Sequence, residues 1–281
     1  MENHYELSQE FAKYFEIVPA DTPELRSQAY RLRYQVYCLE NRIPGFDPAD
    51  YPSGEERDAY DDHALHVLLM HRPTQSVAGT LRLVIHDASD PMWMFPIEEH
   101  AGPLRYAFRP APLREAIGEV SRFILSARFR CRRGEGSFPD GLAEAQPEVA
   151  DDARDRRHGL HPVLGLLKAL LELSWRHRIT FWYAGMEPRL QRRLERFGMG
   201  LHLAAPGISY HGTVNAYFSS VAEVMGQCRA QYPETWRFLT DNGKIWPAAS
   251  GPKAATGSHP SPLEPSSTGM DDMKQSTPTR N

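Results

Sequence analysis

Cysteine is scarce in this chain, whose 281 residues include only Cys38, Cys131 and Cys228. Three widely spaced cysteines argue against a disulfide framework and are typical of cytoplasmic proteins with reduced thiols. The sequence also lacks any apolar run near the ~20 residues that a membrane-spanning helix needs. Residues 1–6 lack the basic and apolar regions of a secretory signal. We therefore expect a cytoplasmic protein without a transmembrane segment.

An excess of positive charge is lacking as well. The 32 lysines and arginines are outnumbered by 36 aspartates and glutamates, which leaves a net charge of −4 at pH 7. Domains that bind nucleic acid usually carry a basic surface. The composition therefore argues against a nucleic-acid partner.

Two stretches lack the hydrophobic patterning of a folded core. Residues 137–158 are acidic and poor in large apolar side chains, which predicts a disordered insertion. Residues 247–281 are rich in proline, serine and threonine without periodicity, which predicts a disordered tail. We expect one folded domain over residues 1–246.

The rest of the chain alternates between strand and helix patterns. Strands are predicted at residues 14–19, 64–71, 77–86, 118–126, 179–184, 199–205 and 214–219. Helices are predicted at residues 21–40, 162–177, 187–197 and 220–231. This order predicts an α/β protein with one mixed sheet and helices on both of its faces.

The fourth predicted strand carries charge where burial is expected. Residues 118–125 are apolar on both faces, yet they include Glu119 and Arg122. Burying unpaired charges costs several kcal/mol, and perturbed ionisable groups cluster at active sites. Side chains alternate along a strand, so these two share a face only if a β-bulge lies between them. We predict a bulge within residues 118–123.

Further ionisable groups recur in a recognisable order along the chain. Arg33 stands four residues before Tyr37, and Asp58 and Asp61 form a D-x-x-D pair. Arg82-Leu83 and the segment Glu119-x-Ser121-Arg122-Phe123 follow. This pattern resembles the acyl-homoserine-lactone autoinducer synthases. Residues 182–188, 196–198 and 210–212 are more similar to the acyltransferases associated with PEP-CTERM/exosortase systems, which are themselves similar to N-acyl amino acid synthases.

The resemblance covers roughly residues 12–243 and implies the GCN5-related N-acetyltransferase (GNAT) fold, a mixed central sheet flanked by helices with a bulged fourth strand. It also implies transfer of a long acyl chain from acyl carrier protein, or from acyl-CoA, to a free amine. The acyl-phosphopantetheine thioester is then a co-substrate, and no permanently bound cofactor and no metal are expected. The bulge would open a slot for the pantetheine arm along the strand edge.

Site residues follow from the same resemblance. The catalytic candidates are Glu119, Arg122, Arg82, Asp58 and Asp61, with Glu119 as general base. The substrate-binding candidates are Arg33, Tyr37, Ser121, Phe123, Arg128, Arg130 and Arg133. Arginines at 128–133 place positive charge beside Gly134 and Gly136, but Cys131 puts the coenzyme A loop pattern out of register. A basic rim suits an acidic acyl carrier protein as partner.

Several alternatives stay open at this stage. Glu119 is either a base or a structural partner of Arg82 or Arg122, with similar weight. Asp58 and Asp61 hold an ammonium group, brace arginines or cap a turn. A metal site that adds His63 and His66 to these aspartates is disfavoured, because the two histidines diverge at a strand start.

The function has alternatives too. The chain is either an N-acyltransferase, an acyl-homoserine-lactone synthase that uses S-adenosylmethionine, or a non-catalytic module that binds acyl carriers. Aromatic and apolar residues at 91–117, including Trp93 and Phe95, either line an acyl tunnel or pack in the core.

Overall fold

The computed structural model describes residues 2–102, 111–130 and 162–247. The predicted insertion at 137–158 and nearly all of the predicted tail lie outside these residues. The strands are β1 (Phe15–Pro19), β2 (Ala64–His71), β3 (Ser76–Ile85), β4 (Ile117–Leu125), β5 (Phe181–Met186), β6 (Leu203–Ser209) and β7 (Thr213–Ser220). They form one sheet in the order β1-β2-β3-β4-β5-β7-β6, in which only the β4–β5 pair is parallel.

Helices surround this sheet. The longer ones are α1 (Glu2–Tyr14), α2 (Pro23–Tyr34), α6 (Pro162–Arg176), α7 (Pro188–Glu195), α8 (Val221–Gln231) and α9 (Pro233–Leu239). Short ones are α3 (Pro96–His100), α4 (Ala111–Arg114) and α5 (Ala127–Arg130). A π-helical turn, η1 (Gln35–Glu40), extends α2, and the 3-10 turns are η2 (Pro48–Asp50), η3 (Ala59–His63) and η4 (Arg72–Thr74). The mixed α/β architecture predicted from the sequence is confirmed.

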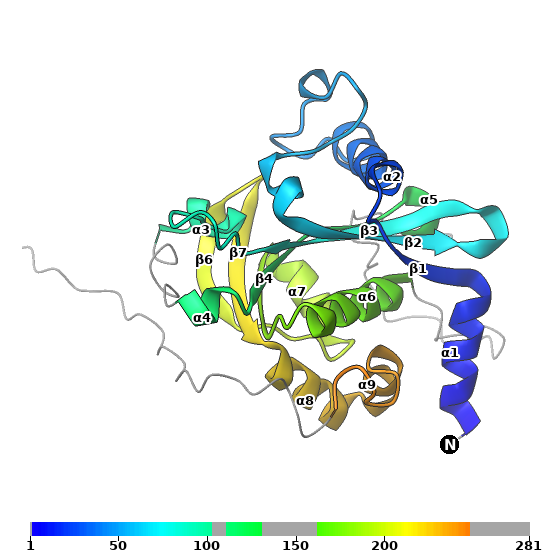
Figure 1. Cartoon of the computed structure of the whole chain (residues 1–281). Coiled ribbons are helices and arrows are strands. Elements are labelled where there is room, and N and C mark those ends of the chain that lie inside the picture. The colour runs from blue at the N-terminus through cyan, green and yellow to red at the C-terminus, as the bar shows by residue number, and fades with distance from the viewer. Residues whose placement is uncertain (1, 103–110, 131–161, 248–281) are drawn as a thin grey trace, which may run out of the picture.

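The two faces of the sheet differ in character. Figure 1 shows α2 on one side of β2 and β3 and α6 on the other. The α6 side is apolar, because the predicted stripe that includes Val163, Leu166 and Leu170 is buried against the sheet. The α2 side carries the polar side chains of the site. No helix within the described ranges is long and apolar enough to cross a membrane.

Two of the longer helices, α1 and α9, were not predicted. Phe11 of α1 packs on Phe15 and Phe238, with ring centroids 5.3 and 5.2 Å apart. Phe238 belongs to α9, so α1 and α9 close one end of the core together (Figure 1). The α1 sequence has few apolar residues, and its buried anchor Phe11 depends on contacts with residues distant in the sequence.

Strand β4 contains the predicted bulge. Arg82 of β3 pairs with Ser121 and Thr80 pairs with Ile124, so two β4 residues stand opposite the single residue Leu81. One of those two, Arg122, has φ of 51°, a left-handed conformation that is costly for a residue with a side chain. The extra residue brings Arg122 to the same face of the sheet as Ser121.

Strands β4 and β5 separate beyond the bulge. They pair only from Ile117 to Val120 on β4 and from Phe181 to Ala184 on β5. Both strands continue past this point, to Leu125 and Met186. The result is a V-shaped opening in the middle of the sheet.

Close packing of α6 on the sheet gives a test of the fold. A Cβ on Gly165 of α6 would lie 2.4 Å from Phe11 Cζ and 2.9 Å from Leu69 Cδ1, whereas one on Gly226 of α8 would meet nothing within 4 Å. We expect G165A to destabilise the protein by about 1–3 kcal/mol through overpacking. G226A should stabilise it by about 0.5–1 kcal/mol through helix propensity. Urea unfolding of both variants checks this, and a stabilised G165A would contradict the packing described here.

Candidate active site

Three arginines and three carboxylates meet on the α2 side of the sheet. We call these residues the ion cluster: Arg33, Glu56, Asp58, Asp61, Arg82 and Arg122. All are buried except Asp58, whose side chain is 29% exposed. Their formal charges cancel, which is the condition for burying so many ionised groups.

The inner part of the ion cluster is built around Arg33 of α2. Its Nη1 and Nη2 donate to Asp61 at 2.7 and 3.0 Å, and its Nε donates to Glu56 at 2.5 Å. Burial by itself would raise the pKa of Glu56, but Arg122 and Arg33 outweigh it and lower this pKa to about 2. The same balance, with Arg33 and Arg82, holds the pKa of Asp61 well below its usual value. Both carboxylates are therefore ionised at neutral pH.

The outer part of the ion cluster involves the two sheet arginines. Arg82 Nη1 donates to Asp58 at 2.5 Å and to Asp61 at 3.0 Å, and its Nε donates to Ser121 Oγ at 3.0 Å. Arg122 Nη2 donates to Glu56 and to Asp58, each at 2.9 Å. Arg82 Nη2 is a buried donor that has no partner in the part of the chain that the structure describes.

Asp58 and Asp61 brace arginines and also cap η3. Asp58 Oδ1 accepts a hydrogen bond from the Tyr60 backbone N–H at 2.9 Å, and Asp61 Oδ2 accepts one from the Asp58 N–H at 2.8 Å. Two of the three roles considered for this pair are thus present at once. Asp58, at the exposed edge, is the carboxylate that a bound ammonium group could reach.

Glu119 lies apart from these ion pairs. It is 1% exposed, and its Oε2 accepts a hydrogen bond from the Ile97 backbone N–H of α3 at 2.9 Å. The alternative in which Glu119 is the ion-pair partner of Arg82 or Arg122 is wrong for the described residues, because those arginines bind Glu56, Asp58 and Asp61. The reason is topological, since residues 56–61 fold over the same strand face.

The protonation of Glu119 follows from this isolation. Burial raises its pKa to about 8, against the lowering effects of the Ile97 N–H and of Arg82. Glu98 adds to the rise, although it is itself paired with Arg114 at 2.9 Å. Near neutral pH this carboxyl is poised between its two protonation states, as a general base requires.

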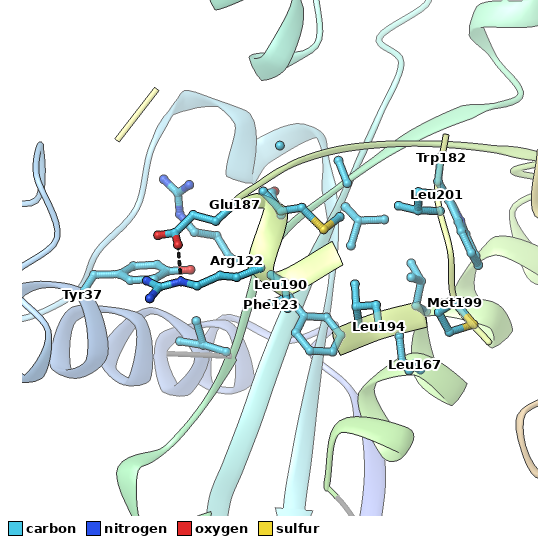
Figure 2. A pocket seen from close by; sticks show the side chains of 18 residues that line it. Tyr37, Arg122, Phe123, Leu167, Trp182, Glu187, Leu190, Leu194, Met199 and Leu201 are labelled. Atoms are coloured by element: carbon cyan, nitrogen blue, oxygen red, sulfur yellow. Dashed lines mark ion pairs between the residues drawn. The ribbon is translucent and has the colours of Figure 1, made fainter. Parts of the chain in front are cut away.

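A cavity of about 220 Å³ fills the opening between β4 and β5. Figure 2 shows Tyr37, Arg122 and Glu187 at one end, and Trp182, Met199 and Leu201 at the other. The wall between the two ends is apolar and includes Phe123, Leu167, Leu190 and Leu194. A molecule with one polar end and a long apolar chain matches this lining.

The predicted substrate-binding residues divide into three groups. Tyr37, Ser121 and Phe123 line the cavity, whereas Arg33 is buried behind it in the ion cluster. Arg128 is exposed beside Arg31 and Gln28 of α2, away from the cavity. Arg130 is the last residue of α5, and the structure describes its backbone alone. Arg133 lies outside the described residues.

The suggested tunnel at residues 91–117 is not where the cavity lies. Phe95 is fully buried in a separate cluster beside Tyr183, at 5.8 Å between ring centroids. Trp93 packs on Tyr60 and His63. Core packing, the other interpretation of this segment, is what the described residues show. Arg193, expected to face solvent on α7, is also buried.

Sequence reasoning missed two members of the site. Glu56 joins two arginines, yet it stands only two residues before the recognised Asp58, in a loop whose fold the sequence does not reveal. Tyr210, at the turn between β6 and β7, has its pKa raised by burial although Arg122 and a hydrogen bond from it oppose the shift. Its neighbour His211 has φ of 49° and stacks on Phe46 at 4.2 Å, which agrees with a turn residue.

The histidines considered for a metal site lie in different surroundings. His66 is buried, and its Nε2 lies 3.3 Å from the Asp61 carbonyl oxygen. Burial lowers the pKa of His66 to about 4. His63 instead packs on Trp93 at 4.8 Å. The described residues contain no group of three or more potential metal ligands.

Comparison with known families decides what this arrangement is. The family of acetyltransferase (GNAT) domains matches residues 32–137, which include the whole ion cluster, Glu119 and the bulge. This part of the chain is thus similar to a GNAT acetyltransferase domain. The protein is accordingly an acyltransferase of the GNAT type.

Solved structures with a similar fold include three acyl-transferring synthases. The CoA-dependent acyl-homoserine lactone synthase BjaI is 21% identical, covers 83% of this chain and 89% of its own, and has a TM-score of 0.50. FeeM, an N-acyl amino acid synthase from uncultured soil microbes, is 14% identical. The match covers 78% of this chain and 96% of FeeM, with a TM-score of 0.49. The acyl-homoserine lactone synthase LasI is 15% identical. The match covers 78% of this chain and 95% of LasI, with a TM-score of 0.48.

The likeness to BjaI confirms the GNAT fold expected from the sequence. Both kinds of synthase named by the sequence resemblance are among the similar structures. No curated protein matches the chain. The predicted association with PEP-CTERM/exosortase systems is not shown by these comparisons.

The ion cluster leads to a stability prediction. E56Q leaves Arg33 and Arg122 short of one buried counter-charge, and we expect it to destabilise the protein by about 3–5 kcal/mol. The pKa of Glu56 is lowered, so its stabilising effect is present above pH ~4.5 and is lost as the pH falls toward 2. On acidification, E56Q should therefore lose less free energy of unfolding than the wild type does.

The neighbouring residue provides the control. Glu55 lies 3.2 Å from Arg31, whose side chain is 68% exposed. We expect E55Q to cost less than about 1 kcal/mol. Chemical unfolding at pH 7 and at about pH 2, where Glu56 becomes protonated, measures both variants. Equal effects of E55Q and E56Q at pH 7 would contradict the role of the ion cluster.

Proposed function

We propose that this protein is an N-acyltransferase that moves a long acyl chain from a phosphopantetheine thioester to the amine of an amino acid or related small molecule. The observation that carries this proposal is the cavity between β4 and β5, which is polar at the Arg122 end and apolar at the Trp182 end. The thioester carbonyl would lie at the polar end, and the acyl chain would extend along Phe123 and Leu194.

The reaction needs little covalent help from the protein. The neutral amine nitrogen attacks the thioester carbonyl carbon, and Glu119 accepts the proton that the amine loses. The C–S bond then breaks, the leaving thiolate takes this proton back from Glu119, and the donor departs as a thiol. Orientation of the two substrates contributes up to ~7–11 kcal/mol. Arg82 Nη2, a buried donor without a partner among the described residues, is suited to hold a substrate oxygen.

The remaining site residues either position the two sheet arginines or contact the substrates. Arg33 has no contact with the cavity and is a positioning residue, because it fixes Asp61 and Glu56, which in turn orient Arg82 and Arg122. Tyr37, Ser121 and Phe123 would contact the donor. Asp58, partly exposed beside Arg82 and Arg122, would receive the ammonium group of the acceptor.

An acidic acyl carrier protein is our preferred donor. Exposed Arg189 and Arg192 lie on α7, and exposed Arg196 follows its last residue. The start of α7 borders the cavity at Arg189. Such a basic surface would steer an acidic partner toward the cavity. Coenzyme A is the other carrier, since BjaI is a CoA-dependent enzyme.

We further propose that the folded domain runs to residue 246, because Trp246 is buried against Trp175.

A second candidate function is acyl-homoserine-lactone synthesis. The fold matches BjaI, which has been solved with S-adenosylmethionine and isopentyl-CoA. The two functions differ in the product, because a lactone synthase closes a ring after acylation and an N-acyl amino acid synthase does not.

Product identity separates the two. We expect mass spectrometry of lipid extracts from cells expressing the full chain to show N-acyl amino acids with a free carboxyl group. These species should be absent from cells with an empty vector and from cells expressing E119Q. A homoserine-lactone product would favour the second function, and no acyl product from the wild-type chain would leave a non-catalytic carrier-binding module.

Replacing Glu119 should separate activity from stability. The pKa of Glu119 is raised from 4.5 to about 8, so between these pH values folding takes up a proton and the contribution of this group to stability falls as pH rises. Glutamine mimics the protonated carboxyl. We expect E119Q to lose activity by about 10²–10⁴-fold while its melting temperature near pH 8.5 equals or exceeds that of wild type.

The control for this variant is E115Q, at an exposed position just before β4. It should change neither activity nor the pH dependence of the melting temperature. In the wild type, kcat/KM should rise with pH toward about 8 as Glu119 ionises. Unchanged turnover in E119Q would remove Glu119 as the base.

A further inference from the structure

The apolar end of the cavity shares one lining residue, Leu201, with a second hollow. This second hollow lies on the surface between α7 and α8, and its lining includes Arg192, Arg196, His202 and Gln227. Leu201 lines both it and the cavity between β4 and β5. Among the described residues that line the two hollows, Leu201 is the one they share.

The backbone around Leu201 is firmly held. Gly198, with φ of 74°, ends α7 and turns the chain back. The Gln191 side chain then donates to the Leu201 carbonyl oxygen at 2.9 Å, and the His202 N–H donates to Ser219 Oγ at 2.7 Å. These bonds fix the backbone of Leu201, the residue that lines both hollows.

The other residues at this end form a thicker wall. Trp182 is 1% exposed, and its Nε1 donates to Ser174 Oγ at 2.9 Å. Met199 is 3% exposed, whereas Leu201 is only partly buried. Of these three residues at the apolar end, Leu201 is thus the least buried, and it is the one that also lines the second hollow.

We infer that Leu201 sets the length of the acyl chain that the protein transfers. This inference rests on the proposed N-acyl transfer. The methyl end of the chain meets Leu201, and chains that are longer than the distance from Arg122 to Leu201 are excluded (Figure 2). Removing the side chain beyond Cβ would join the cavity to the second hollow and give a longer chain room to extend.

The experiment compares L201A with L190A. Leu190 is also a partly buried leucine that lines the cavity, but it does not reach the second hollow. The measurement is the chain-length distribution of acyl products in lipid extracts of cells that express each full-length variant. Each extra methylene that becomes buried favours the longer product about fourfold, the equivalent of ~0.8 kcal/mol.

In L201A, we expect the amount of product two carbons longer, relative to the main wild-type product, to rise by about 15-fold. This is the effect of burying two methylenes. L190A should change this ratio by less than about threefold, since it widens the cavity without extending it. L201F fills the end of the cavity, and its main product should be shorter than that of wild type. If L201A does not fold, L201F carries the test.

The outcomes separate the two proposals. Acyl products from the wild type with the same length distribution in L201A and L201F would overturn the role of Leu201 and leave acyl transfer intact. A shift in L190A as large as that in L201A would also overturn it. No acyl product from the wild type would overturn the proposed function itself, and the inference with it.

Discussion

The β-bulge at Arg122 is the constraint on which the rest of the site depends. A left-handed backbone at a non-glycine residue costs about 1–2 kcal/mol, and the hydrogen bonds of Arg122 to Glu56 and Asp58 offset this cost. The extra residue does two things at once. It turns the Arg122 side chain into the ion cluster, and it lies where β4 leaves its parallel partner β5. The charged network and the apolar cavity thus have one geometric origin.

Two carboxyl environments lie close together on the α2 side of the sheet. Glu56 is surrounded by two guanidinium groups, which hold its pKa at about 2. Glu119, with a backbone N–H as its hydrogen-bond partner, has a pKa of about 8. Both are buried, so the difference comes from the number of nearby cations. This separation lets Glu56 remain an ionised anchor, while Glu119 has the pKa that the proposed proton transfer needs.

The sheet divides stability and chemistry between its faces. Leucine-rich α6 fills the apolar side, where α1 and α9 close the core, and most of the side chains buried on this face are hydrophobic. The α2 side carries the ion cluster, whose burial is expensive unless every charge is matched. The cavity passes from one side to the other through the gap between β4 and β5. A long acyl chain would therefore enter beside charged groups and end among core side chains.

The sequence by itself determined much of the framework. The apolar periodicity of residues 162–176 predicts α6, and the rule of alternation requires a bulge if Glu119 and Arg122 are to serve one site. The order of Arg33, Asp58, Asp61 and Arg82 indicated a common site through its resemblance to the autoinducer synthases. These inferences succeed because they depend on local periodicity or on a motif. The structure contains them as expected.

Only the tertiary structure decided which charges are paired. Arg122 meets Glu56, 66 residues earlier in the chain, and no local pattern encodes that contact. The same holds for the isolation of Glu119, the core position of Phe95, the burial of Arg193 and the place of Leu201 between two hollows. Each depends on how distant segments pack over one strand, and a single sequence carries no signal for such contacts.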